Sequence, residues 1–272
     1  MVLSKINDFF WYRIKNLIKY EKKLIKYQGY GDRSILEFKR RNDLKWSTIE
    51  KILKELIIVD GLELRNCIRK LYENNKDLIE NPNTFISHFG PVGKSGALIL
   101  NQFLRCYPGK SWKIIPATKL QELGEDSSVI FLDDFIGTGQ QAITYIKEIG
   151  YTLNSSTKPY LFTICATEMG IKKIERNNSN FKIESSIILN EKEFSLLDDQ
   201  SQILSNDEKI KIKKLNAKLG ILDNSNFHLG LPFAFYYSAP DNALGILWND
   251  NTKYIDDKKN DKKWYALIPR EY

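Results

Sequence analysis

Apolar residues are spaced differently in the first eighty residues and in the rest of the chain. In the first part they recur every three or four positions, with lysines between them, over residues 3–27, 46–57 and 62–72. This spacing places the apolar side chains on one face of a helix and predicts a helical module over residues 1–80. Pro82 disfavours helix at the residue before it and marks the expected boundary.

After Pro82 the apolar residues form short continuous runs that alternate with helical segments. The runs predict strands at 84–88, 112–116, 128–132 and 160–166. Helical spacing predicts helices from about residue 93 to 106, from 138 to 149, and from the last strand to about 177. Strands joined by helices predict an α/β fold, with helices on both faces of a mostly parallel sheet.

From about residue 181 the two patterns are mixed. A lysine-rich helix is expected at 206–219, and strand-like runs lie at 232–238 and 244–248. We expect this part to cap the sheet rather than extend it. The predicted organisation is therefore a basic helical module over 1–80 and an α/β domain over 81–272, with a C-terminal hood over about 181–272.

The composition is that of a folded protein. Hydrophobic residues make up 42% and charged residues 28% of the 272 positions, which excludes a wholly disordered chain. No apolar run is long enough to cross a bilayer, and the lysine-dense start does not resemble a secretory signal. We therefore expect a cytoplasmic protein without a membrane partner, in which the three dispersed cysteines are reduced thiols.

The positive charge is concentrated at the N-terminus. Residues 1–60 carry 14 Lys or Arg against 8 Asp or Glu, whereas the rest of the chain carries 27 against 26. A basic arm on a neutral body is typical of proteins that contact nucleic acid or another anionic partner. A solvated basic face is the alternative, because Lys and Asn are abundant throughout the sequence.

The segment from Val129 to Gln141 carries the clearest candidate chemistry. An apolar strand ends in Asp133 and Asp134, and a Gly-Thr-Gly turn then leads into a helix. Ligands of open α/β sheets bind at the carboxyl ends of strands. Glycine amides and a helix N-terminus favour a phosphate. Acids followed by a phosphate cradle suit a phosphorylated ribose, whereas an Asp pair that only caps a turn is the alternative.

This segment resembles the ribose-5-phosphate loop of type I phosphoribosyltransferases. The resemblance implies that Asp133 and Asp134 contact the ribose 2′- and 3′-hydroxyls and serve as the catalytic and Mg²⁺-binding acids. It also implies that the loop binds the 5′-phosphate through Gly137, Thr138, Gly139, Gln140 and Gln141. Gln141 departs from the family, which usually has Thr or Ser at this position, although its amide can still donate a hydrogen bond.

Two further segments follow predicted strands. Phe89 to Gly96 is not a Walker A loop, because His88 stands where that motif needs glycine. In the phosphoribosyltransferase interpretation, Lys94 and the amides of Ser95 and Gly96 would bind the pyrophosphate of phosphoribosyl pyrophosphate (PRPP). An ordinary helix start with a solvated lysine is the alternative.

Glu168 follows the strand at 160–166 and would lie at the same edge of the sheet as the acids. It could orient a nucleophile, accept a proton, or bind Mg²⁺ through water. Alternatively, it only begins the next helix, where an acid interacts favourably with the helix dipole.

The C-terminal part carries a second resemblance. Pro240-Asp241-Asn242, Ile246-Leu247-Trp248 and the closing segment from Trp264 to Arg270 follow the acidic loop in order. They resemble the C-terminal signature of a phosphoribosyltransferase-like family, PRTase-CE, found in bacterial conflict systems. The resemblance covers roughly residues 84–270, and its polar members Asp241, Asn242 and Arg270 are hood candidates for a functional role.

Together, the resemblances imply a protein that binds Mg²⁺-PRPP, or a nucleotide containing ribose 5-phosphate, and transfers or hydrolyses at ribose C1′. They further imply an effector of retron-type anti-phage defence, partnered with a reverse transcriptase and its RNA or DNA through the basic module. The alternative is a non-catalytic sensor of PRPP or a nucleotide that regulates a nucleic-acid or protein partner. The acceptor and the oligomeric state are left open.

Overall fold

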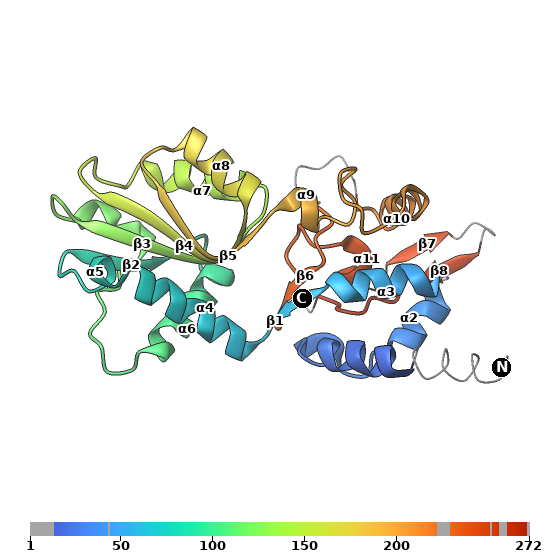
Figure 1. Ribbon diagram of the computed structural model, residues 1–272. Coiled ribbons are helices and arrows are strands. Elements are labelled where there is room, and N and C mark those ends of the chain that lie inside the picture. The colour runs from blue at the N-terminus through green and yellow to red at the C-terminus, as the bar shows by residue number, and fades with distance from the viewer. Residues whose placement is uncertain (1–13, 43, 222–228, 251, 256–259, 271–272) are drawn as a thin grey trace. The chain divides into compact units, whose positions relative to one another are not determined.

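A computed structural model describes residues 14–42, 44–221, 229–250, 252–255 and 260–270 (Figure 1). The chain forms two compact units, one from Met1–Asp60 with Lys192–Tyr272 and the other from Gly61–Glu191. Of the helix expected over 3–27, residues 14–24 are helical and residues 1–13 lie outside the described part. The units differ from the expected domains, since residues 61–80 belong with the sheet and residues 192–272 join the N-terminal residues.

The unit Gly61–Glu191 is built on a parallel sheet of four strands in the order β2-β3-β4-β5. These are β2 (Thr84–His88), β3 (Ser128–Ile136), β4 (Lys158–Thr167) and β5 (Lys182–Leu189). In the register of the sheet, Ser87 lies opposite Phe131 and Phe131 opposite Leu161. The first, third and fourth expected strands are thus confirmed as β2, β3 and β4.

Strand β5 is not among the expected strands, because its sequence, Lys-Ile-Glu-Ser-Ser-Ile-Ile-Leu, is polar in its first half and its apolar run is only three residues long. It lies at the edge of the sheet, where most of its side chains are only partly buried or exposed. The prediction that residues from about 181 only cap the sheet is therefore wrong for residues 182–189. An edge strand does not need the apolar sequence of a central one.

Helices cover both faces of this sheet, which confirms the predicted fold class (Figure 1). On one face lie α4 (Gly61–Asn74) and α6 (Ser95–Cys106), with α5 (Lys76–Ile79) following α4, and on the other lie α7 (Gln140–Gly150) and α8 (Glu168–Asn177). The apolar stripe expected on α7, including Ile143 and Ile146, packs with Val129, Phe131 and Leu161 of the sheet.

The edge of the sheet beyond β2 is formed by a short segment rather than a full strand. In the expected strand 112–116, only Ile114 makes a parallel bridge, with Ile86 of β2. The Ile86 N–H donates to the Lys113 carbonyl (2.8 Å), and the Ile115 N–H donates to the Ile86 carbonyl (3.0 Å). A short 3₁₀ helix, η2 (Ala117–Glu122), follows this segment.

This edge segment creates a topological switch point between β2 and β3. From β2 the chain runs through α6 to the segment beyond β2, and it then returns to β3 on the other side of β2. The connection after β3 runs in the opposite direction, through α7 to β4. In open α/β sheets, ligands bind outside the carboxyl ends of the strands at such a point. The fold therefore places the ends of β2 and β3 at the expected position of a ligand.

The other unit brings together the two ends of the chain. Its elements before residue 61 are η1 (Gln28–Tyr30), α2 (Ile35–Asn42), α3 (Trp46–Glu55) and β1 (Ile57–Val59); those near or after residue 191 are α9 (Glu191–Phe194), α10 (Asn206–Lys218), β6 (Phe233–Phe235), α11 (Gly245–Trp248), β7 (Lys253–Ile255) and β8 (Asp261–Lys263). β1 pairs in parallel with β6, and β7 pairs antiparallel with β8.

Two sequence predictions fall in this unit. The expected lysine-rich helix at 206–219 is confirmed as α10. The expected strand at 244–248 is wrong, because a short apolar run does not distinguish a strand from a buried helix.

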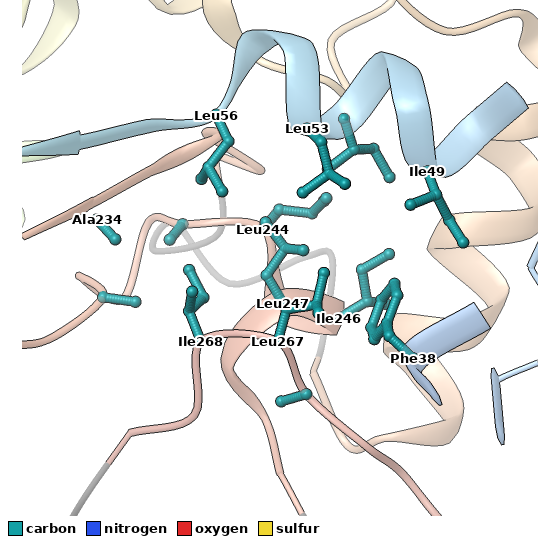
Figure 2. Close-up of a cluster of buried hydrophobic side chains, with 14 of the residues drawn as sticks. Phe38, Ile49, Leu53, Leu56, Ala234, Leu244, Ile246, Leu247, Leu267 and Ile268 are labelled. Carbon is teal, nitrogen blue, oxygen red and sulfur yellow. The ribbon is translucent and has the colours of Figure 1, made fainter. Parts of the chain in front are cut away.

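One hydrophobic core explains why these two distant segments form one unit. Figure 2 shows Ile49, Leu53 and Leu56 of the α3 region facing Leu244, Leu247 and Ile268. The Tyr27 hydroxyl also donates to the Pro269 carbonyl (2.6 Å). Among the described residues, no helix is both long and apolar enough to cross a membrane.

Replacing Leu53 by alanine should destabilise this unit by about 2–5 kcal/mol, because its fully buried side chain would leave a cavity in the shared core. Leu36→Ala is the matched control, because Leu36 is 58% exposed on α2, and it should change the free energy of unfolding by less than about 0.5 kcal/mol. Urea unfolding followed by tryptophan fluorescence measures both. Equal effects would contradict the shared core.

Candidate functional site

Asp133 lies at the carboxyl end of β3 and is held by two hydrogen bonds. Its Oδ1 atom accepts from the Ser95 hydroxyl (3.1 Å) and from the backbone N–H of Asp134 (2.9 Å). Burial and, next, the neighbouring Asp134 carboxylate raise the pKa of Asp133 well above its usual range, although both hydrogen bonds oppose this shift. The site therefore holds a half-buried acid that can accept or donate a hydrogen bond, depending on pH.

Gly96 brings the N-terminus of α6 against the ends of two strands. A Cβ atom at this position would lie 2.1 Å from the Phe89 carbonyl oxygen and 2.8 Å from that of Leu132. Only glycine permits this approach, and the approach places Ser95, the first residue of α6, beside Asp133. Gly96 thus has a clear packing role in addition to the ligand-binding role predicted from the sequence.

Lys94 precedes α6 at its N-cap position, and its side chain is exposed. Its backbone N–H donates to the Pro91 carbonyl (3.2 Å), which closes the turn between β2 and α6. The predicted set Lys94, Ser95 and Gly96 is therefore brought to the same sheet edge as Asp133. Ser95 contacts the acid directly.

The loop between β3 and α7 is also fixed by close packing. Gly139 has a left-handed backbone (φ +74°) and is the N-cap of α7, and Thr138 is buried. The Gly137 carbonyl accepts a hydrogen bond from the Thr167 hydroxyl (2.6 Å). The loop therefore has a defined shape, with the first N–H groups of α7, which have no partner within the helix, at its end.

Gly170 of α8, the helix that follows β4, supports this loop. A Cβ atom on Gly170 would lie 2.1 Å from the Gly137 carbonyl oxygen, and one on Gly139 would lie 2.8 Å from the Gly170 carbonyl oxygen. Thr167, the N-cap of α8, accepts from the Gly170 N–H (3.0 Å) and donates to Gly137. The start of α8 and the candidate phosphate loop are thus in backbone contact.

Gln140 and Gln141 begin α7, and their surroundings differ. The side-chain oxygen of Gln140 accepts from the Lys173 ammonium of α8 (2.9 Å), which places a cation beside the loop. Gln141 is exposed.

Glu168 is the first residue of α8, and its carboxylate pairs with Lys172 one turn later (2.9 Å). The Glu168 side chain is 40% exposed. The described contacts of Glu168 do not include Asp133 or Asp134. The start of α8 is near the loop, but the Glu168 carboxylate has the partner expected of an acid in the first turn of a helix.

The hood candidates belong to the other compact unit. The Arg270 guanidinium lies over the Trp248 ring (4.0 Å) and donates to Asp241 (2.6 Å) and to the Ala239 carbonyl (2.7 Å). The Asn242 backbone carbonyl accepts from the Leu231 N–H (2.9 Å). These contacts hold the C-terminal segment in place.

Sequence reasoning missed four residues that shape the site: Thr167, Gly170, Lys173 and Tyr145. The Tyr145 ring of α7 lies edge-on to the Phe89 ring (4.7 Å between centroids), which joins α7 to the β2–α6 loop. A signal was present for Gly170, because glycine in the first turns of a helix is unfavourable unless close packing requires it. The other contacts join residues far apart in sequence and had no local signal.

The donor chemistry of the acid pair fits Mg²⁺. Among the described residues, no group of three or more His, Cys, Asp or Glu could hold a metal ion. Mg²⁺ typically keeps several waters and is held by one or two carboxylates together with phosphate oxygens of a ligand. Asp133 and Asp134 therefore fit a magnesium ion that arrives with a phosphorylated ligand.

A parallel α/β sheet with a switch point, an acid pair and a glycine loop defines a phosphoribosyltransferase-like protein. The profile of the PRTase-CE family matches residues 32–270, and the chain belongs to this family. No curated protein matches the sequence of this chain.

The chain is similar over about half of its length to solved phosphoribosyltransferases. They include a hypoxanthine-guanine-xanthine phosphoribosyltransferase (15% identity, TM-score 0.35, covering 50% of this chain and 80% of that one). An orotate phosphoribosyltransferase of Mycobacterium tuberculosis H37Rv in complex with PRPP is 13% identical (TM-score 0.33, covering 47% of this chain and 74% of that one). The adenine phosphoribosyltransferase of Leishmania tarentolae is 13% identical (TM-score 0.35, covering 47% of this chain and 72% of that one).

Gly170→Ala should displace the loop at Gly137 and destabilise the protein by about 1–3 kcal/mol, because the new methyl group would overlap a backbone carbonyl. Gly150→Ala is the control. Gly150 is the last residue of α7, with no atom within 4 Å of a Cβ, so alanine should be neutral or stabilise by up to about 1 kcal/mol. Thermal melts distinguish the two, and a Gly170→Ala variant as stable as the wild type would contradict the close contact.

Asp133→Asn should raise the melting temperature at pH 8. In the unfolded chain Asp133 ionises near its usual pKa, whereas the folded protein holds the proton to higher pH, so the wild type loses stability as pH rises between the two values. Asparagine can accept the same two hydrogen bonds without ionising, which removes about 1.4 kcal/mol of destabilisation per unit by which the pKa is raised.

Melts of the wild type and Asp133→Asn at several values between pH 4 and 8 measure this effect. Asp77→Asn, at an exposed position on α5, should track the wild type at every pH. If Asp133→Asn melted below the wild type throughout the range, the inference that the pKa of Asp133 is raised in the folded protein would be wrong.

Proposed function

We propose that this chain binds Mg²⁺-PRPP, or a nucleotide containing ribose 5-phosphate, at the switch point between β2 and β3. One observation carries the proposal: the acid pair and the glycine loop share the end of β3, and the Ser95 hydroxyl joins the start of α6 to Asp133 (3.1 Å). Membership of the PRTase-CE family supports a phosphoribosyl ligand.

In this proposal the loop from Gly137 to Gly139 and the first N–H groups of α7 bind the 5′-phosphate. Lys173, beside Gln140, adds a positive charge at the same place. The carboxylates of Asp133 and Asp134 accept hydrogen bonds from the ribose hydroxyls. Lys94 and the N–H groups of Ser95 and Gly96 bind the pyrophosphate, because the first amides of a helix have no partner within it. The Ser95 hydroxyl itself already donates to Asp133.

Hydrolysis or transfer would occur at ribose C1′. The bond from C1′ to the pyrophosphate oxygen breaks, positive charge develops on the ribose ring, and nearby carboxylates stabilise it. Water or another acceptor forms the new bond at C1′ and loses a proton. When bound, Mg²⁺ would neutralise charge on the pyrophosphate, with Asp133 and Asp134 as its protein ligands.

A sensor without turnover is the second candidate function. The observation that favours it is the ion pair between Glu168 and Lys172, which engages the carboxylate proposed to orient a nucleophile or accept its proton. The raised pKa of Asp133 acts in the same direction, since a protonated acid stabilises positive charge less well. In either case, the cellular setting implied by the family resemblance is anti-phage defence beside a reverse transcriptase, with the basic N-terminal residues contacting its RNA or DNA.

Phosphorus NMR of PRPP with Mg²⁺ and purified protein tests the proposal. Wild type should release pyrophosphate, or, as a sensor, broaden the PRPP resonances without turnover. Asp133→Asn combined with Asp134→Asn should abolish both responses. Lys173→Met should weaken binding by about tenfold, the loss of one charge-assisted hydrogen bond.

Lys147→Met is the control for that loss. Lys147 is exposed in the last turn of α7, away from the loop, so its variant should bind as the wild type does. A response to PRPP that survives the double substitution, or no response from the wild type, would refute binding at this loop.

A further inference from the structure

The helix over residues 14–24 and the turn that follows it present a basic stripe to solvent. The stripe consists of six exposed residues at the spacing of one helix face: Lys15, Ile18, Lys19, Lys22, Ile25 and Lys26. At 1.5 Å per residue, Lys15 and Lys22 are about 10 Å apart along the helix axis. We call these six residues the lysine stripe.

The opposite side of the same helix holds the lysine stripe in place. Tyr20 and Leu24 are buried in the core that joins the two chain ends, and Leu17 packs against this core. The Lys23 ammonium donates to the Leu53 carbonyl at the end of α3 (2.8 Å). Because the helix is fixed by these contacts, its backbone needs no ordering when a partner binds the exposed face.

Three positive charges of the stripe are not neutralised by nearby acids. Lys15, Lys19 and Lys22 have no hydrogen-bond or ion-pair partner among the residues that the structure describes. The Glu21 carboxylate, on the same helix, is engaged elsewhere and accepts from the Ile35 N–H (3.1 Å). These three ammonium groups are therefore available to an anionic partner.

The surroundings of the stripe add positive charge. Burial and, next, the neighbouring Lys19 lower the pKa of Lys23, which shows that like charges are close together here. Lys54, at the end of α3, is 73% exposed and lies 3.8 Å from Glu55. Within the stripe, Lys26 pairs with Asp60 (3.0 Å). Repulsion between like charges reduces the stability of the free protein, and a bound polyanion would offset it.

The composition of the stripe favours a phosphate backbone over a protein partner. Lysine is depleted in protein–protein interfaces, whose binding energy comes from buried aromatic and apolar anchors. Ile18 and Ile25 are seven residues apart with lysines between them, so they do not form such an anchor. A second copy of the chain would meet the same positive charge. Lysine ammonium groups bind phosphate oxygens, and phosphates repeat regularly along a nucleic-acid strand.

We propose that the lysine stripe binds the phosphodiester backbone of a nucleic acid, with Lys15, Lys19 and Lys22 each contacting a phosphate. Contacts to the backbone carry no sequence information, so the binding is independent of sequence. The stripe and the proposed PRPP site belong to different compact units, so either proposal can fail without the other.

Fluorescence anisotropy of a labelled single strand of about 20 nucleotides, as DNA and as RNA, measures binding to the full chain at several KCl concentrations. The wild type should bind both strands, with an affinity that falls as salt rises. Replacing Lys15, Lys19 and Lys22 together by glutamine should reduce the slope of log affinity against log salt by about 2, at about 0.7 per lost contact. At 0.1 M salt this corresponds to a loss of affinity on the order of 100-fold.

The matched control removes the same charge from the other compact unit. Lys76, Lys119 and Lys147 are exposed there, and their triple glutamine variant should keep the wild-type slope and an affinity within about threefold. Both triple variants should melt as the wild type does, because all six side chains are exposed. Equal losses of affinity in the two variants would show that only the net charge matters and would overturn the proposal.

Polyglutamate of similar length tests the class of partner. It offers negative charge without the sugars and bases that can pack against Ile18 and Ile25, so it should displace the labelled strand at least fivefold less well than unlabelled DNA. Displacement as effective as that by DNA would indicate a surface for acidic proteins, and the proposal would be wrong. A wild type that binds neither strand would show that the stripe is a solvated face, which also contradicts the proposal.

Discussion

The candidate site depends on two places where a helix begins in contact with the backbone of the sheet. At Gly96 and Gly170, any side chain would overlap a carbonyl oxygen, of Phe89 in one case and of Gly137 in the other. The first contact brings Ser95 to Asp133, and the second fixes the loop that precedes α7. Because protein interiors are closely packed, both loops take their shape from these contacts.

This packing also explains the electrostatics of the site. The start of α6 covers the end of β3, so the Asp133 carboxylate loses water and sits beside a second acid, which raises its pKa. Such an arrangement reduces the stability of the free protein at neutral pH. Acidic groups that reduce the stability of the ligand-free protein are typical of binding sites. There, a bound ligand or a cation that arrives with it offsets the unfavourable interaction.

The unit made of the two chain ends has a different basis. Its core joins Leu53 of α3 to Leu247 and Leu267 of the C-terminal part, and β1 pairs with β6 (Figure 2). The Arg270 contacts with Trp248 and Asp241 close the C-terminal segment of the same unit. The residues that resemble the family signature near the C-terminus therefore have structural partners within this unit, whatever further role they have.

The sequence alone determined the α/β class, the three central strands and the apolar face of α7, because continuous apolar runs and helical spacing are local signals. It also located the acid pair and the glycine loop, since both lie within thirteen residues. Only the tertiary structure decided that β5 completes the sheet, that α3 shares a core with the C-terminal part, and that Lys173, Thr167 and Gly170 support the loop. Each of these depends on contacts between residues distant in sequence, and edge strands and packing partners leave little trace in local spacing.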